Sequence, residues 1–148
     1  PSGMETRFED KGDHYLLNGA KMWISNAPHA DIAVVWAKDE KGRINGLIVE
    51  RGMEGFTTPE TYGKWSLRAS CTGELVFSDV KVPKENLLIG KDGLGAPMKC
   101  LDSARYGIAW GAIGAAMDLL RCCSPIFIGT YSIREAHRSI SINSKEIG

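Results

Sequence analysis

The sequence has no net charge, few cysteines and histidines, and no long hydrophobic run. Its 18 basic and 18 acidic side chains cancel, so bulk charge gives no support for binding to nucleic acid or to an anionic membrane. No apolar stretch approaches the roughly 20 residues that a membrane-spanning helix needs. The four cysteines and three histidines form no C-x-x-C pair and no cluster with metal-ligand spacing. We therefore expect reduced thiols, no disulfide framework and no metal site.

What is present is the composition of an ordinary globular protein. Of the 148 residues, 43% are hydrophobic and 24% are charged, which is enough for one modest domain with its own core. No targeting segment is recognisable. Because the sequence opens with Pro1 rather than an initiator methionine, we expect the native N-terminus to lie upstream.

Short β-type runs separated by turn residues occupy the first ninety residues. Ala30 to Ala37 is almost entirely apolar, which predicts a buried strand, and further strands are expected at 14–17, 44–50 and 72–77. Gly, Pro, Asn and charged residues predict the breaks between the strands, at Asn18-Gly19, 26–29, 38–43 and Ser78-Asp79. Several short strands with such turns are typical of a β-sandwich or barrel.

The hydrophobic period changes after Pro97, a residue suited to a first helical turn. The apolar residues then follow a helical stripe, at Met98, Leu101, Ile108, Ala112, Ala115 and Leu119. Further along, Pro125 is expected to stop the helix. Isoleucines that alternate with polar residues between 126 and 142 predict at most strand-like pieces.

The most informative stretch is Lys21 to Ala27, KMWISNA. Strand alternation places Trp23 and Ser25 on one face and Met22 and Ile24 on the other. An aromatic plane beside a small hydroxyl suits a flat ring with polar edges, such as a flavin. On these residues alone, a core position for the tryptophan is the commoner outcome.

Three segments together indicate a family. The segments LNGAKMWISNAPHADIAVVWAK, GKWSLRASCTGELVFSDVKVPKENLL and CLDSARYGIAWGAIGAA resemble the acyl-CoA dehydrogenases. The last two are most similar to the glutaryl-CoA dehydrogenase branch, and the similarity runs in unbroken order from Pro1 to about Leu120. Several motifs in family order make a far stronger signal than any one of them alone.

The resemblance implies a domain organisation. Residues 1–90 would form the middle β domain, a barrel or sandwich, and residues 91–121 the first helix of a C-terminal helical bundle. Residues 122–148 match nothing in the family. For this divergent tail we favour a truncation or an artefact of the gene end over an authentic alternative C-terminus.

The resemblance also implies a chemistry. The family uses FAD to oxidise acyl-CoA and passes the electrons to an electron-transfer flavoprotein. The glutaryl-CoA branch, in lysine and tryptophan degradation, converts glutaryl-CoA into crotonyl-CoA and carbon dioxide. The intact parent would be a homotetramer, in the mitochondrial matrix of a eukaryote or the cytoplasm of a bacterium.

Site residues carry over where the motifs match. Trp23, Ile24 and Ser25 match the flavin-contacting motif, with the tryptophan covering the flavin and the serine bonding its polar edge. The acyl-CoA-contacting segment matches Met98, Lys99, Cys100, Leu101, Asp102, Ser103, Ala104 and Arg105. Asp102 would accept a hydrogen bond from the pantetheine arm. The alternative for Asp102 and Arg105 is a surface ion pair worth only about 0.3 kcal/mol.

Other positions stay open. Lys64, Arg68 and Ser70 match a loop near the flavin-facing side, with capping and surface contact as an equal alternative. The family's catalytic carboxylate has no match here, since Glu135 and Glu146 fit no motif around it. We therefore expect the chain alone not to turn over substrate. The alternatives are another short-chain acyl-CoA dehydrogenase, or a non-catalytic β module that binds a partner through its exposed helix.

Overall fold

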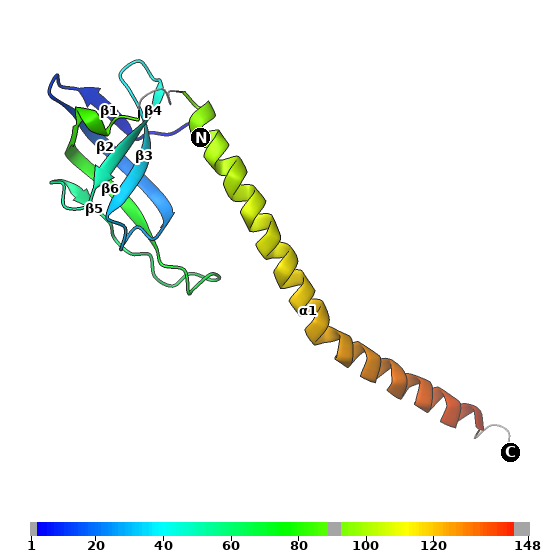
Figure 1. The fold of residues 1–148 in the computed structure, drawn as a ribbon. Helices are drawn as coiled ribbons and strands as arrows, with labels where there is room; N and C mark the ends of the chain where they lie inside the picture. The colour runs from blue at the N-terminus through cyan, green and yellow to red at the C-terminus, as the bar shows by residue number, and fades with distance from the viewer. Residues whose placement is uncertain (1–2, 89–92, 144–148) are drawn as a thin grey trace. The chain divides into compact units, whose positions relative to one another are not determined.

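The computed structural model describes residues 3–88 and 93–143, which form a strand-rich segment followed by one long helix (Figure 1). In chain order the elements are β1 (Arg7–Asp10), β2 (His14–Ser25), β3 (Ile32–Lys38), β4 (Ile44–Glu50), β5 (Phe56–Thr57), β6 (Thr72–Pro83), the short 3₁₀ helix η1 (Lys84–Asn86) and α1 (Gly95–Asn143). The chain divides into two compact units, Pro1–Lys99, hereafter the β unit, and Cys100–Gly148, hereafter the helix unit. The expected class, mainly β with one long helix after it, is confirmed.

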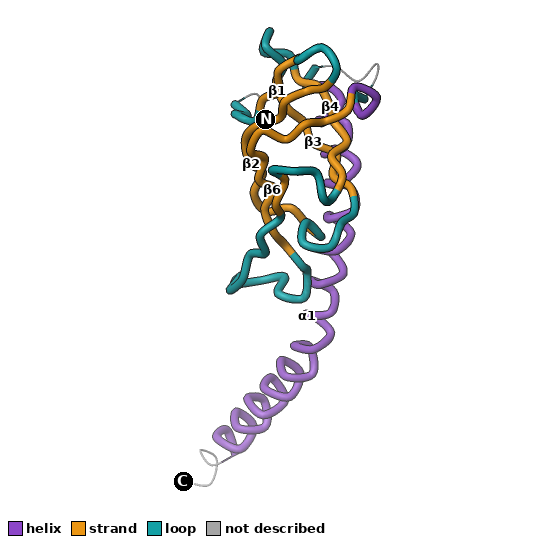
Figure 2. Tube along the Cα trace, turned by 90° about the vertical axis from the view of Figure 1, so that its left-hand side faces the viewer, coloured by secondary structure: helices purple, strands orange, loops and turns teal. Residues whose placement is uncertain are grey.

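The strands form one sheet in the order β4-β3-β1-β2-β6-β5. Every pairing is antiparallel except that of β1 with β3, which is parallel. The chain after η1 returns to β4, where Leu87 bridges Leu47 and the Leu88 amide donates to the Gly46 carbonyl at 2.9 Å. The sheet therefore curls so that the segment after β6 meets the β4 edge. Figure 2 shows the wound strands, and this is the barrel-like arrangement that the strand pattern predicts.

A hydrophobic core fills the curled sheet. Phe77 in this core stacks on the partly buried Phe56 with ring centroids 5.2 Å apart, a separation typical of favourable aromatic pairs. The clustered buried residues are Phe8, Leu17, Ala27, Val35, Ala37, Leu47, Val49, Leu75, Phe77, Val80 and Val82. This core belongs wholly to the β unit.

The strand β3 is buried on only one face. Val35 and Ala37 lie in the core, whereas Ile32 is 59% and Val34 is 54% exposed. The expectation of a fully buried strand is therefore wrong. An almost all-apolar run hides the period-two alternation that one-sided burial normally leaves in a sequence.

Two predicted turns are instead irregularities within long strands. The strand β2 runs straight through Asn18-Gly19, and β6 runs through Ser78-Asp79, with a register shift where the two pairs face each other. The Asp79 amide donates to the Asn18 side chain at 2.8 Å and the Asn18 amide group donates back to Asp79 at 2.9 Å. Gly19 is needed for close packing, because a Cβ there would lie 2.7 Å from the Thr6 Cα atom.

The other two predicted breaks are confirmed. Residues 26–29 form a turn after β2, and residues 39–43 of the predicted charged stretch 38–43 join β3 to β4. In the second of these, the Asp39 carboxylate accepts hydrogen bonds from the amides of Lys41 at 2.9 Å and Arg43 at 2.8 Å. An aspartate that binds nearby amides in this way is a common reason for a tight turn.

The helix α1 is longer than the sequence pattern predicts. It begins at Gly95, so Pro97 lies in its first turn as expected, but it continues past Pro125 to Asn143. The prediction that Pro125 ends the helix is wrong, as is that of strand-like pieces beyond it. A proline removes one backbone hydrogen bond and can be accommodated by a bend, and α1 changes direction where its ribbon passes from yellow to orange (Figure 1). Within the described residues, no helix has the length and apolar character to cross a membrane.

Candidate functional site

A β-bulge near the end of β2 positions the tryptophan that the sequence marks out. Between the pairs Lys21–Leu75 and Ile24–Gly73, β2 carries one residue more than β6. Trp23, in this bulge, has a φ of 60°, a left-handed conformation that is rare for a bulky residue. Bulges often re-aim a side chain beside a functional site. Trp23 is 63% exposed, so it is not a core residue.

Trp23 and Ser25 line a cleft of about 520 Å³. The rest of its wall comes from the loop before β6 and the start of that strand, with the residues Thr61, Tyr62, Gly63, Lys64, Trp65, Ser66, Leu67, Ser70 and Thr72. Ile24 lies elsewhere, partly buried against the hydrophobic core. The predicted shared face of Trp23 and Ser25 is therefore present. Met22, predicted to accompany Ile24, is instead 58% exposed, because the bulge interrupts the alternation.

The sequence predicts only part of the loop that lines the cleft. Of the three loop residues that match the family motif, Lys64 and Ser70 line the cleft, whereas Arg68 does not. Tyr62, Trp65 and Leu67 were not candidates. They are 80%, 103% and 75% exposed. Two aromatic residues in a glycine-containing loop can indicate a binding surface, but they belong to no strand or helix pattern.

The polar groups in and around the cleft make hydrogen bonds within the chain. Lys64 Nζ donates to the Leu67 carbonyl, the Ser70 carbonyl and the Thr72 hydroxyl at 2.9, 2.5 and 2.6 Å. The Tyr62 hydroxyl donates to the Glu60 carboxylate at 2.9 Å. This hydrogen bond to a charged acceptor favours the protonated phenol and so raises the pKa of Tyr62.

The residues proposed for acyl-CoA lie together in the first turns of α1, from Met98 to Arg105. Arg105 Nη1 donates to Asp102 Oδ1 at 2.7 Å, and both side chains are more than half exposed. That contact is the surface pair weighed as the alternative for these two residues. Cys100 and Leu101 are exposed as well.

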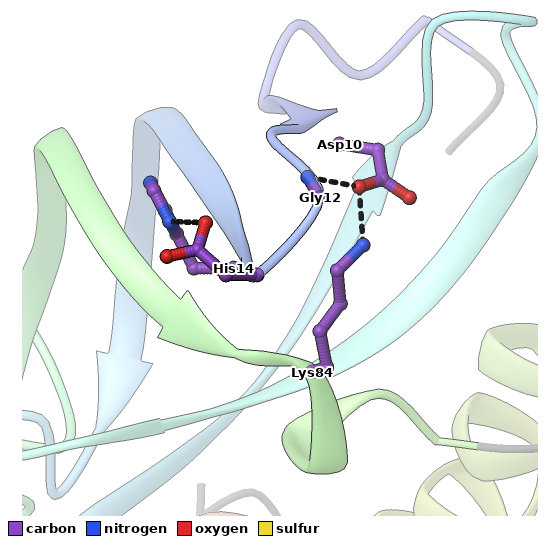
Figure 3. Close-up of polar contacts among 5 residues, drawn as sticks. Asp10, Gly12, His14 and Lys84 are labelled. Carbon is purple, nitrogen blue, oxygen red and sulfur yellow. Dashed lines mark hydrogen bonds and ion pairs between the residues drawn. The ribbon is translucent and has the colours of Figure 1, made fainter.

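A second hollow, of about 320 Å³, lies among the tips of two hairpins. Asp10 and Asp39 are among its lining residues. Figure 3 shows Asp10 Oδ1 accepting hydrogen bonds from the Gly12 amide and from Lys84 Nζ. The Lys84 ammonium also lies 4.0 Å from the centroid of the Tyr15 ring. Asp10 pairs with Lys84 and Asp39 pairs with Arg43. We therefore interpret the hollow as a structural feature of the hairpin ends.

The cleft has the character of a site for a flat ring with polar edges. Its walls offer two indoles, a phenol and several hydroxyls, and aromatic walls with a few polar groups are the usual make-up of a cofactor pocket. The model of the acyl-CoA dehydrogenase middle domain matches residues 1–80. The chain belongs to the acyl-CoA dehydrogenase family.

Individual relatives sharpen this assignment. The chain is 40% identical over 124 residues to the mitochondrial isovaleryl-CoA dehydrogenase of Pongo abelii, a match that covers 79% of the chain and 29% of the relative. It is 45% identical over 112 residues to a short-chain specific acyl-CoA dehydrogenase of Clostridium acetobutylicum, covering 72% of the chain and 29% of the relative.

Among solved structures, a glutaryl-CoA dehydrogenase of Mycobacterium smegmatis in complex with FADH2 superposes with a TM-score of 0.75 and 48% sequence identity. The match covers 78% of this chain and 30% of that one. The chain thus spans less than a third of the length of the relatives it matches. These relatives are named for different acyl-CoA substrates.

Proposed function

We propose that this chain supplies the flavin-facing β domain and the first helix of an FAD-dependent acyl-CoA dehydrogenase. The observation that carries the proposal is the cleft in which Trp23 and Ser25 face the loop 61–71. When bound, FAD supplies the acceptor for the hydride that leaves the acyl group. The chain's own residues bind and orient that cofactor.

The cleft fits a flavin by chemistry. The exposed face of Trp23 provides a stacking surface, and the Ser25 hydroxyl can donate to or accept from a polar ring edge. Among its described lining residues there is no carboxylate. The proposal accordingly assigns this cleft binding and positioning, and gives it no general base.

For the substrate we propose glutaryl-CoA, with oxidative decarboxylation to crotonyl-CoA and carbon dioxide and transfer of electrons to an electron-transfer flavoprotein. The support is the likeness to the glutaryl-CoA dehydrogenase structure. Isovaleryl-CoA and short-chain acyl-CoA are the competing substrates, because relatives of both kinds match as well. The segment Met98 to Arg105 would contact the CoA portion.

The test is a titration of the purified chain with FAD, followed by flavin absorbance and tryptophan fluorescence. We expect Trp23→Gly to weaken binding about tenfold, equivalent to about 1.4 kcal/mol. We expect Ser25→Ala to weaken it about fivefold through the loss of one hydrogen bond. Glycine is chosen at position 23 because it adopts a positive φ freely, so removing the ring leaves no strained backbone behind.

Met22→Ala is the matched control, since Met22 neighbours Trp23 in the same bulge, is 58% exposed, and is not a lining residue of the cleft. It should change the affinity for FAD less than twofold. Wild-type protein that leaves the FAD spectrum unchanged, or a Trp23→Gly variant that binds as well as wild type, would contradict the proposal. Adding glutaryl-CoA, isovaleryl-CoA and butyryl-CoA separately to the FAD complex then shows which one perturbs the flavin spectrum most.

One observation favours a second candidate. The helix α1 exposes large apolar side chains, among them Ile108, Trp110 and Ile113, as a partner-binding module would. A chain that binds a helical partner and shows no response to FAD would favour that role over the flavoenzyme.

A further inference from the structure

The loop of residues 61–71, hereafter the Lys64 loop, forms one wall of the cleft and is closed at its base. The Thr61 amide donates to the Thr72 carbonyl at 2.9 Å, and the Glu74 amide donates to the Pro59 carbonyl at 2.9 Å. Between these anchors the loop leaves the sheet and returns. The conformation of the loop therefore determines where the cleft residues opposite Trp23 lie.

Apolar burial does not hold the Lys64 loop in place. Its three large side chains, Tyr62, Trp65 and Leu67, are at least 75% exposed. The backbone is also turned sharply, with φ values of 72° at Gly63 and 50° at Leu67. A left-handed leucine costs on the order of 1 kcal/mol, so other interactions must hold this conformation.

The ammonium group of Lys64 provides these interactions. It reaches the Leu67 carbonyl, the Ser70 carbonyl and the Thr72 hydroxyl, all within 2.9 Å. The Leu67 carbonyl also accepts the Ser70 amide at 3.0 Å. The strained leucine and the return of the loop to β6 therefore converge on one nitrogen atom.

A lysine ammonium has three N–H donors, and here each has an acceptor within the chain. Lys64 consequently has no donor left for a ligand, although it lines the cleft. A positive charge in a flavin cleft invites assignment as a contact to a phosphate or to the ring. The geometry points instead to an internal role.

We propose that Lys64 is a positioning residue, whose ammonium group fixes the Lys64 loop in the shape that makes the cleft wall. The flavin as occupant of that cleft rests on the proposed function, whereas the role of Lys64 in the loop does not. The three acceptors converge on a point, so a compact ammonium fits them. The planar, outward-directed donors of a guanidinium do not, and Lys64→Arg should fail as Lys64→Met does.

The first experiment measures amide hydrogen exchange at Ser70 and Thr61 in the full 148-residue chain. We expect protection at these amides to fall about tenfold in both Lys64→Met and Lys64→Arg. Core amides of β2 and β6 should keep their protection. The matched control is Lys81→Met, which removes an exposed lysine of β6 and should leave the loop amides unchanged.

The second experiment repeats the FAD titration on the same variants. We expect Lys64→Met and Lys64→Arg each to bind FAD about tenfold more weakly, with an unchanged midpoint of unfolding. Wild-type affinity in Lys64→Arg together with loss in Lys64→Met would overturn the proposal in favour of a direct charge contact. Full loop protection in Lys64→Met would overturn it too. If wild-type protein does not bind FAD, the proposed function fails while the exchange data still decide the role of Lys64.

Discussion

The β unit and the helix unit differ in where their side chains find contacts. The β unit buries a core from five of its six strands, with Leu17, Leu47 and Val80 fully inaccessible. In the helix unit every residue from Leu101 to Ser124 is exposed, including large apolar ones such as Trp110 and Leu120. The first unit carries its own hydrophobic stabilisation, and the described part of the second carries almost none.

This difference shows that the two units depend on different sources of stability. A sheet that closes on a core gains free energy from burial, and its residues are constrained by close neighbours. A helix whose described side chains are exposed gains little from burial and depends more on intrinsic propensity, and glycines such as Gly107 and Gly111 lower that propensity. The same kind of substitution should therefore have unlike effects in the two units.

The largest contrast is expected for glycine to alanine. At Gly55 an added Cβ would lie 2.0 Å from the Ser78 carbonyl oxygen, and φ is +81°. Backbone strain and the clash together should lower the free energy of unfolding of the β unit by about 4 kcal/mol. At Gly111 an added Cβ meets nothing within 4 Å, so Gly111→Ala should stabilise the helix by about 1 kcal/mol.

Guanidinium unfolding followed by near-UV circular dichroism measures the first effect, and helical ellipticity at 222 nm measures the second. The two variants act as controls for one another, because the chemical change is identical. The contrast between the units fails if Gly111→Ala destabilises the chain, since that would reveal close packing around α1. It fails equally if Gly55→Ala is tolerated.

A smaller contrast is expected for leucine to alanine. Leu47 in β4 is fully buried, whereas Leu119 in α1 is 66% exposed. Removing the buried side chain should cost about 3 kcal/mol, through lost burial and the cavity left behind. Removing the exposed one should cost less than about 0.5 kcal/mol. Denaturant midpoints of the two variants, compared with wild type, check both values, and similar losses in both would contradict the comparison.

The sequence predicted local features of the β unit well. The turn at 26–29 and the charged hairpin at 38–43 rest on residues that act on their own neighbours, as Asp39 does on the amides of Lys41 and Arg43. Asn18-Gly19 and Ser78-Asp79 have the same turn chemistry, yet they face each other inside a ladder between strands that are far apart in the sequence. At these positions the pairing with a distant strand determines the conformation, and a local sequence pattern does not reveal that pairing.

The candidate site also combines residues that a local pattern predicts with residues that depend on distant parts of the chain. Strand spacing predicts that Trp23 and Ser25 share a face, and both line the cleft, but the bulge that positions Trp23 is not visible in that spacing. The opposing wall, with Tyr62 and Trp65, depends on how a distant loop returns to β6, which no local sequence pattern predicts. Pro125 shows that even a strong local signal can mislead. A proline favours the end of a helix, but here the helix continues because its backbone bends.

The smallest expected effect concerns pH, and it again separates the units. Among the described residues, every carboxyl group with a lowered pKa lies in the β unit. The hydrogen bond from Lys84, with a second from the Gly12 amide, lowers the pKa of Asp10 below its ordinary 3.8. Burial alone would raise the pKa of Asp39, but hydrogen bonds from the amide and guanidinium of Arg43 outweigh it and lower that pKa too.

A carboxyl with a depressed folded-state pKa stabilises the fold at pH values above its unfolded pKa, because the carboxylate is charged in both states there but makes its favourable interactions only in the native state. This stabilisation is lost as the pH falls from the ordinary value of 3.8 through the lower folded value. The guanidinium midpoint of the β unit should hence be level near neutrality and decline below about pH 4. Lys84→Met removes the partner of Asp10, so its midpoint should be lower near neutrality and should decline less on acidification. Two parallel curves would show that the contact between Lys84 and Asp10 contributes nothing to the stability of the β unit.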